Sequence, residues 1–185
     1  PRYKQLVQEC FGNKKPFGIP PVIDNKVNDT GTLVQILEIS KVYEDGKMDI
    51  KTQGQEVFTI LEVIKELPDK LYSGAIVNYP PNTEQGNRAL MQQIIAAIRQ
   101  LHQLLKVEKE FKKADEALWS YDVAHHAGLS LTEEYELLQL THELQRQEYL
   151  KRHLKKVIPV IAEMETLKER IQLNGHFKNL GGFEL

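Results

Sequence analysis

The chain has 185 residues, of which 41% are hydrophobic and 27% are charged, and its formal net charge is −2. These values are typical of a globular protein with one domain, or with one domain and a helical annex. Acidic and basic residues are roughly balanced in both halves of the chain. No basic arm therefore indicates binding to nucleic acid through its phosphates.

Cysteine content and hydropathy exclude further classes of protein. Cys10 is the one cysteine, so an internal disulfide and a zinc site built from cysteines are both excluded. A reducing, cytoplasmic setting fits this composition. No apolar run approaches the roughly 18 residues of a membrane span, and no signal peptide is recognisable. We expect a cytoplasmic chain with no membrane segment and no cofactor.

The N-terminal segment predicts one helix and one short strand. Apolar residues in 3–11 recur at helical spacing, and Gly12 and Asn13 are stop signals. The apolar segment 16–24 predicts a short strand at a sheet edge or a bulge, because two successive prolines cannot donate ladder hydrogen bonds. The composition of 24–31 predicts a loop.

Residues 33–80 have the pattern of consecutive antiparallel strands. Segments 33–40 and 47–53 flank Asp45-Gly46, a hairpin signal that depends on positive φ. Gly54 then predicts a bend or a bulge before a β-branched strand over 56–65. A last strand lies within 72–80. Residues 1–81 therefore predict one helix and about five strands in a small antiparallel sheet or barrel.

After residue 81 the period becomes helical. Apolar spacing predicts a helix over 88–111. Ser130 and Glu133 form a capping-box pattern that opens a short helix. A long helix follows, in which Pro159 predicts a kink or a break. Asn174-Gly175 predicts its end, and a tail completes the chain.

Catalytic motifs are not recognisable in the sequence. It has no phosphate-binding G-x-x-x-x-G-K-[ST] loop and no G-x-S-x-G elbow. His142-Glu143 begins like a zinc-protease helix, but position 146 is arginine where the second ligand would stand. Ser120, Asp122 and His125 are close in sequence, which is weak evidence for a triad because triads are assembled by the fold.

Three further features each have a functional and a structural interpretation. His125 and His126 are metal-ligand candidates, but a helix end with Gly128 as its left-handed stop explains them as well. The basic run 150–156 is either a contact for an acidic partner or the solvated face of an amphipathic helix. The strand with Pro20-Pro21 offers an edge to an extended peptide, or is covered by a preceding segment.

The order of these elements resembles the LON substrate-binding domain, the N-terminal domain of Lon proteases. The likeness begins with "PRYKQLVQEC", continues through "PFGI" and "GTLVQILEISKVYEDGKMDIKTQGQEVFTI", and includes "YSGAIVNY". After residue 81 it rests on helix order and on the long final helix.

The resemblance implies an α+β fold: a small PUA-like β pseudo-barrel followed by an α-helical bundle with a long C-terminal helix. It divides the chain into a β-rich LON-type domain over 1–81, whose first strand is expected before Pro1, and a helical subdomain over 82–185. The residues that match the family's motifs are expected to be structural, with Tyr3 packed on the sheet. They are Arg2, Tyr3, Gly31, Thr32, Asp45, Gly46, Gly54 and Phe58.

The resemblance also implies binding without catalysis. The ATPase and the Ser-Lys peptidase of Lon proteases lie downstream of this domain, and neither motif is present in this chain. We expect a module that binds unfolded polypeptide or a partner protein, with no catalytic residue, metal ligand or cofactor. The alternatives are a PUA-like RNA-binding protein, by analogy of fold, and a metal-dependent enzyme around Asp122, His125 and His126.

Overall fold

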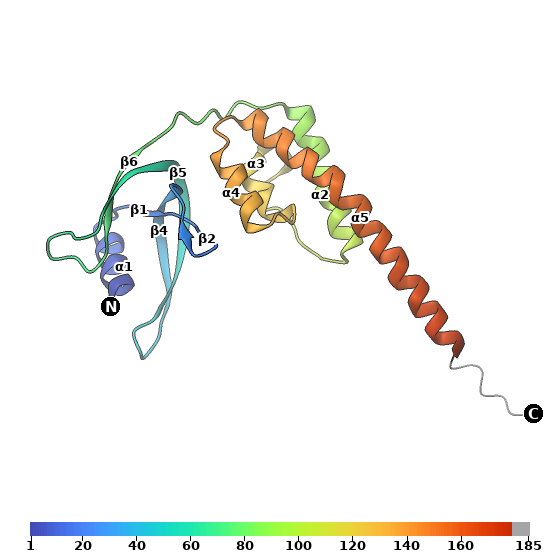
Figure 1. Cartoon of the computed structure of the whole chain (residues 1–185), viewed down its shortest axis with the longest axis horizontal. Coiled ribbons are helices and arrows are strands. Elements are labelled where there is room, and N and C mark those ends of the chain that lie inside the picture. The colour runs from blue at the N-terminus through green and yellow to red at the C-terminus, as the bar shows by residue number, and fades with distance from the viewer. Residues whose placement is uncertain (179–185) are drawn as a thin grey trace, which may run out of the picture. The chain divides into compact units, whose positions relative to one another are not determined.

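The computed structural model describes residues 1–178, and side chains up to residue 173 (Figure 1). These residues form two compact units: a β unit of Pro1–Asn82 with Leu131–Thr141, and a helical unit of Thr83–Ser130 with the chain from His142 onward. The elements of the β unit are α1 (Arg2–Gly12), β1 (Phe17–Ile19), β2 (Val22–Ile23), β3 (Lys26–Val27), β4 (Thr30–Val42), β5 (Met48–Ile64), β6 (Gly74–Asn78) and α4 (Leu131–Gln139). Those of the helical unit are α2 (Arg88–Leu104), η1 (Asp115–Ala117), α3 (Ser120–Val123), η2 (Ala124–His126) and α5 (Glu143–Lys178).

The β unit is built on a four-stranded antiparallel sheet in the order β1-β4-β5-β6. β4 and β5 form a long hairpin and pair from Thr30 opposite Thr59 to Val42 opposite Met48. The predicted antiparallel sheet and the predicted α+β class are therefore confirmed.

Two predictions for the segment before β4 are wrong in detail. The single strand predicted over 16–24 is divided at its prolines into β1, which pairs with β4, and β2, which pairs with β3. β3 lies inside the predicted loop 24–31. Asp24 and Asn25 both have positive φ and form a two-residue turn between β2 and β3, a backbone conformation that these residue types tolerate.

A β-bulge lies beside Gly54, as the sequence predicts. Leu33 pairs with Glu56 and Val34 pairs with Gly54, which leaves Gln55 as an extra residue on β5. The segments predicted as separate strands on either side of Gly54 are nonetheless one strand, because the bulge accommodates the extra residue while pairing with β4 continues.

The centre of the sheet depends on close packing between one aromatic ring and two glycines. Phe58 is 3% exposed and pairs with Gly31 across β4 and β5. A Cβ atom added to Gly31 would lie 2.5 Å from Phe58 Cζ and 2.8 Å from the Ile19 carbonyl oxygen. A Cβ at Gly18 would lie 2.9 Å from the same ring. A side chain at either position would therefore clash with Phe58 unless its ring moved.

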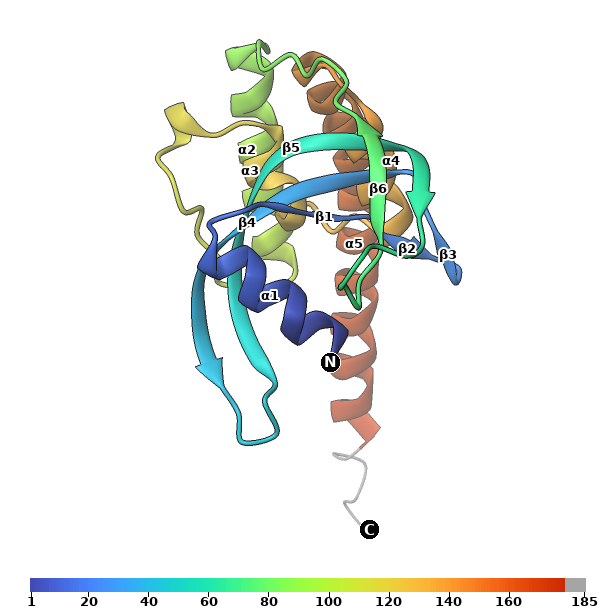
Figure 2. The same ribbon diagram turned by 90° about the vertical axis from the view of Figure 1, so that its left-hand side faces the viewer.

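α1 packs on β4 near the hairpin, where Figure 2 shows it crossing in front of the strands. Its buried residues Val7 and Cys10 form a core cluster with Ile36. Half-buried apolar residues complete this cluster: Leu6, Phe17, Ile39, Met48 and Ile50. The predicted helix is confirmed and ends at Gly12, with Asn13 as its C-cap, but its predicted apolar stripe is too wide, since Phe11 is 42% exposed.

α4 belongs to the β unit although it lies between helices of the helical unit in the sequence. It packs against β4, and the Thr30 amide donates a hydrogen bond to the Tyr135 hydroxyl at 3.4 Å. The division at residue 81 that the resemblance implies stays a prediction. The structure adds that the chain returns to the β unit over 131–141.

The helical unit is built on α2 and α5, which pack against each other (Figure 1). The buried apolar residues come from both helices and from the segment between them: Leu90, Met91, Ile94, Ile95, Ile98, Leu101, Leu118, Val123, Ala127, Leu150 and Leu154. None of the described helices is both long and apolar enough to cross a membrane.

Both helices end at positions that the sequence does not predict. α2 stops at Leu104, before the expected end at residue 111, because Lys106 has a positive φ of 54° and the Val107 amide donates to the His102 carbonyl. α5 passes through Pro159 without a break and continues to Lys178, beyond Gly175. Of the predicted tail, residues 179–185, with Gly181-Gly182, lie outside the described residues.

A buried polar network fixes the start of α5. Glu143 and Arg146 form an ion pair of 2.9 Å with side chains only 2% and 1% exposed. The Glu143 carboxylate also accepts hydrogen bonds from the amide and hydroxyl of Ser120. Gln147 donates to Glu143 and accepts from the Asn87 amide, so the network also fixes the start of α2.

Gly31→Ala is expected to destabilise the chain by about 1–3 kcal/mol, because Phe58 and β1 must move to admit the methyl group. Gly12→Ala is the matched control, since nothing lies within 4 Å of a Cβ at that position. Urea unfolding measures both variants. Equal stability of the two would contradict the packing described for Phe58.

Arg146→Met is expected to cost about 3–5 kcal/mol, because it leaves the Glu143 carboxylate buried without its partner. Adding Glu143→Gln removes that charge while keeping an oxygen that accepts from Ser120, so the double variant should recover part of the loss. A double-mutant cycle of unfolding free energies measures the coupling. Simple additivity of the two single changes would show that the pair contributes no coupling.

Candidate functional site

The β unit has a groove of about 470 Å³ between α1 and the β4–β5 hairpin. Val7 and Met48 belong to the apolar cluster beneath it. The full lining is Pro1, Tyr3, Lys4, Val7, Tyr43, Gly46, Lys47, Met48 and Asp49. The groove therefore combines an apolar floor with aromatic and charged edges.

The α1 edge of the groove is held in place from the side that faces away from the hairpin. Glu9 accepts hydrogen bonds of 2.6 Å from Lys70 Nζ and from the Tyr72 hydroxyl. Gln5 accepts from the Leu71 amide. The Lys70 and Tyr72 hydrogen bonds lower the pKa of Glu9, and the hydrogen bond to Glu9 raises the pKa of Tyr72 to about 12. α1 is thus tied to the connection between β5 and β6.

The hairpin edge has a defined turn. The Gly46 amide donates to the Tyr43 carbonyl at 2.8 Å, and the Tyr43 amide donates to the Lys47 carbonyl at 2.9 Å. Gly46 has a φ of 75°, so the predicted need for positive φ is confirmed at the glycine. The turn also contacts α1, because Lys4 Nζ donates to the Asp45 carbonyl. Its loop is longer than a two-residue turn.

Tyr3 and Tyr43 are the aromatic residues of the groove lining. Tyr3 is 76% exposed, so its expected packing on the sheet is wrong. The Tyr43 hydroxyl donates to Asp49 at 2.8 Å, and Lys41 Nζ lies 4.4 Å from the Tyr43 ring centroid. A tyrosine presents a large apolar face and a polar tip, which suits contact with varied polypeptide segments.

The residues singled out from the sequence fall into two groups. Gly31, Thr32, Gly54 and Phe58 lie within paired strands of the sheet: Gly31 faces Phe58, Thr32 pairs with Val57, and Gly54 pairs with Val34. Their structural role stays a prediction.

The other motif residues lie beside the groove. Arg2 begins α1, next to Tyr3. Asp45 and Gly46 form the hairpin turn, and Asp45 pairs with Lys47 at 2.8 Å. The sequence analysis missed Lys4, Tyr43 and Met48. The sequence did place Tyr43 at the hairpin, since it lies two residues before the Asp45-Gly46 turn.

The triad candidates of the helical unit do not converge on a reactive centre. Ser120 is fully buried and bound to Glu143, whereas Asp122 accepts hydrogen bonds from the Trp119 amide and Lys113. The His125 ring contacts the His126 ring in a tilted arrangement, with centroids 4.0 Å apart.

The histidines around η2 instead hold a turn. His102 Nε2 lies 3.2 Å from the His126 carbonyl oxygen, and His153 Nε2 lies 3.1 Å from the Ala127 carbonyl oxygen. Gly128 has a φ of 72°, which confirms the predicted left-handed stop. Within the described residues, no group of three or more potential ligands is placed to hold a metal ion.

Comparison with protein families decides the identity of the fold. The family model of the ATP-dependent protease La (LON) substrate-binding domain matches residues 1–156. The chain belongs to this family. The predicted resemblance is therefore confirmed, and the groove lies in the β unit of a LON substrate-binding domain.

Solved structures of LON domains share the fold of this chain. A Lon N-terminal domain protein from Xanthomonas campestris superposes with a TM-score of 0.61 at 22% identity, covering 82% of this chain and 83% of its own. The N-terminal domain of Mycobacterium avium complex Lon protease gives 0.58 at 15% identity, covering 77% and 78%. A search of curated proteins gives no match.

The LON domain is expected to lose stability as the pH falls through about 6.5, because burial and the neighbouring His125 and His102 lower the pKa of His126. Lys109 and Lys112 add to this effect. The unfolded chain takes up the proton first, so the stability contributed by neutral His126 is present above pH 6.5 and is lost below it.

Thermal melts at pH 7.5 and pH 5.5 measure this dependence. His126→Gln should reduce the drop in Tm, while the control His142→Gln, at an exposed position in the same unit, should keep the wild-type drop because His126 is unchanged. An identical drop in all three proteins would show that other groups cause it.

Proposed function

We propose that this LON domain is a recognition module that binds segments of unfolded or partner polypeptide and does not cleave them. The observation that carries the proposal is the groove between α1 and the β4–β5 hairpin. Family membership supports it, since the family is described as the substrate-binding domain of the Lon protease.

The chemistry of the groove suits polypeptide better than a small polar ligand. Its floor of Val7 and Met48 receives apolar side chains, and Tyr3 provides a ring with its face in solvent. A methionine in a binding surface adapts to side chains of different shape. The charged lining residues are Lys4, Lys47 and Asp49. Each already has a partner within the β unit, since Lys47 pairs with Asp45, Lys4 donates to the Asp45 carbonyl and Asp49 accepts from Tyr43. This disfavours a strong preference for one net charge.

Exposed apolar side chains also lie along the strands of the β unit: Leu37 and Val42 on β4, Leu61 and Val63 on β5, and Ile76 on β6. Val42 directly precedes Tyr43 of the groove lining, so it extends the apolar surface at the hairpin edge. These contacts favour binding that is broad in sequence preference.

Tyr3→Ala is expected to weaken binding of an unfolded polypeptide about tenfold, because an exposed aromatic ring that a ligand covers contributes more than 1 kcal/mol to binding. Fluorescence anisotropy with a reduced, alkylated and labelled protein measures the dissociation constant. Tyr79→Ala is the control, since Tyr79 is an exposed tyrosine of the same unit outside the groove.

Two results would contradict the proposal. The first is the absence of saturable binding to the unfolded polypeptide. The second is equal weakening by Tyr3→Ala and Tyr79→Ala, which would place binding elsewhere. Gel analysis of the same mixtures tests the non-catalytic part, because new fragments that accumulate with time would show cleavage.

A further inference from the structure

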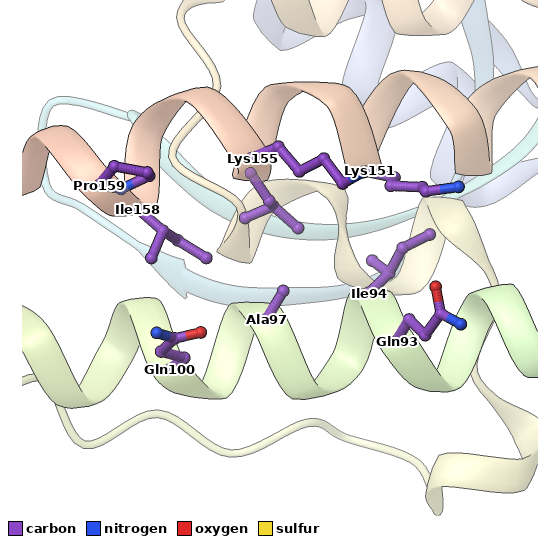
Figure 3. A pocket seen from close by; sticks show the side chains of 9 residues that line it. Gln93, Ile94, Ala97, Gln100, Lys151, Lys155, Ile158 and Pro159 are labelled. Atoms are coloured by element: carbon purple, nitrogen blue, oxygen red, sulfur yellow. The ribbon is translucent and has the colours of Figure 1, made fainter.

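The basic run of 150–156 contributes to a second groove, in the helical unit. Leu150, His153 and Leu154 are buried, whereas Lys151 and Lys155 lie along a groove of about 380 Å³ between α2 and α5. In Figure 3 the two helices run in the same direction, and side chains of α2 point toward α5. The run is therefore more than the solvated face of a helix.

The floor of this groove is apolar. Ile94 and Leu154 are each 1% exposed, and Ala97 and Ile158 are half-buried beside them. Because Ala97 has the smallest of these side chains, it leaves room for the groove between the two helices. The space accepts one apolar side chain of medium size.

The rim of the groove offers hydrogen-bonding groups. Gln93 and Gln100 lie on the α2 side, and among the described residues neither amide has a hydrogen-bond partner. Pro159 has no N–H group, so the Lys155 carbonyl lacks its usual donor four residues later in the helix. Glutamine amides complement the N–H and C=O groups of a peptide main chain, and a carbonyl without its usual helical donor can accept from an N–H group.

The α5 rim is positively charged. Segment 149–158 contains Lys151, Arg152, Lys155 and Lys156 and no acidic residue. Lys151 has a partner in Glu148 at 3.3 Å, whereas the described part of the chain offers Lys155 no acidic partner. A ligand carboxylate at this rim would therefore pair with Lys155 without having to displace a carboxylate of the chain itself.

We propose that the groove between α2 and α5 binds a short acidic and apolar segment of polypeptide. Its apolar side chain lies on Ala97 and Ile158, its flanking carboxylate pairs with Lys155, and Gln93 and Gln100 bond its main chain. The inference rests on the proposed function in one respect only, that the ligand is polypeptide. The inference adds a second site, which prefers acidic ligands, whereas the groove between α1 and the β4–β5 hairpin has no such charge preference.

The length of the groove sets the length of the segment. Gln93 and Gln100 are seven positions apart, which corresponds to roughly 10 Å along a helix. An extended chain advances about 3.3 Å per residue, so the site spans about three residues. The ligand is thus a pattern such as acidic–apolar–acidic, present in many unfolded segments.

Labelled peptides with the centre Glu-Leu-Glu between Gly-Ser pairs test the proposal by fluorescence anisotropy with the full chain. Versions with Lys-Leu-Lys and Glu-Gly-Glu test the charge and the apolar anchor. The expected result is binding of the first peptide only, weakened about tenfold by Lys155→Glu and by added salt. Gln93→Ala should weaken it severalfold.

Matched variants separate the groove from general charge. Lys156→Glu makes the same charge change one position away, outside the groove, and Gln92→Ala is the corresponding control on α2. Both should leave the affinity within about twofold. Equal weakening by Lys155→Glu and Lys156→Glu would overturn the site, as would equal binding of the Lys-Leu-Lys peptide.

Two further outcomes separate this inference from the proposed function. Retained binding of unfolded polypeptide, without binding of Glu-Leu-Glu, would overturn the inference and leave the proposed function standing. Concentration-dependent self-association in sedimentation velocity, abolished by Lys155→Glu but not by Lys156→Glu, would identify a second copy of this chain as the occupant and overturn the peptide assignment.

Discussion

The helical unit depends on one buried ion pair, between Glu143 and Arg146. Its carboxylate binds Ser120 at the start of α3, and Gln147 connects it to Asn87 at the start of α2. The Glu143 amide also donates to the Thr83 carbonyl, which fixes the chain where it enters this unit. Such a pair is costly to desolvate, so its value lies in setting the direction of two helices and hence the groove between them.

The β unit depends on a different constraint, the absence of side chains beneath Phe58. Gly18 and Gly31 let β1, β4 and the Phe58 ring approach closely, and Gly31 pairs directly with Phe58 in the sheet. Nearer the other end of β4, α1 packs on the sheet through the core cluster of Val7, Cys10 and Ile36. The groove of the β unit, which Tyr3 and Tyr43 line, is the space that remains between α1 and the β4–β5 hairpin.

Much of the fold follows from local patterns in the sequence. The helical spacing in 3–11, the turn at Gly46 and the bulge beside Gly54 each express a local backbone preference, and the structure confirms each. Predictions were wrong at the ends of helices, which tertiary contacts determine and local sequence patterns do not. α2 stops before Lys106, whose left-handed conformation the sequence does not predict, and α5 continues as one helix through Pro159.

The sites were less predictable than the fold, because both grooves are assembled from segments far apart in the sequence. Tyr3 and Tyr43 come together only once α1 has packed on the hairpin. The basic run at 150–156 was visible, but its two interpretations could not be separated without the position of α2. Membership of the LON substrate-binding family indicates the kind of ligand and not the residues that contact it.

The central claim, that this LON domain captures polypeptide in the groove of its β unit, is tested most directly by hydrogen–deuterium exchange. The full chain is compared with and without a saturating unfolded polypeptide. The account predicts slower exchange in α1 and in the hairpin turn at 43–47, with the centre of the sheet unchanged. Unchanged exchange in both segments, with protection elsewhere, would contradict it.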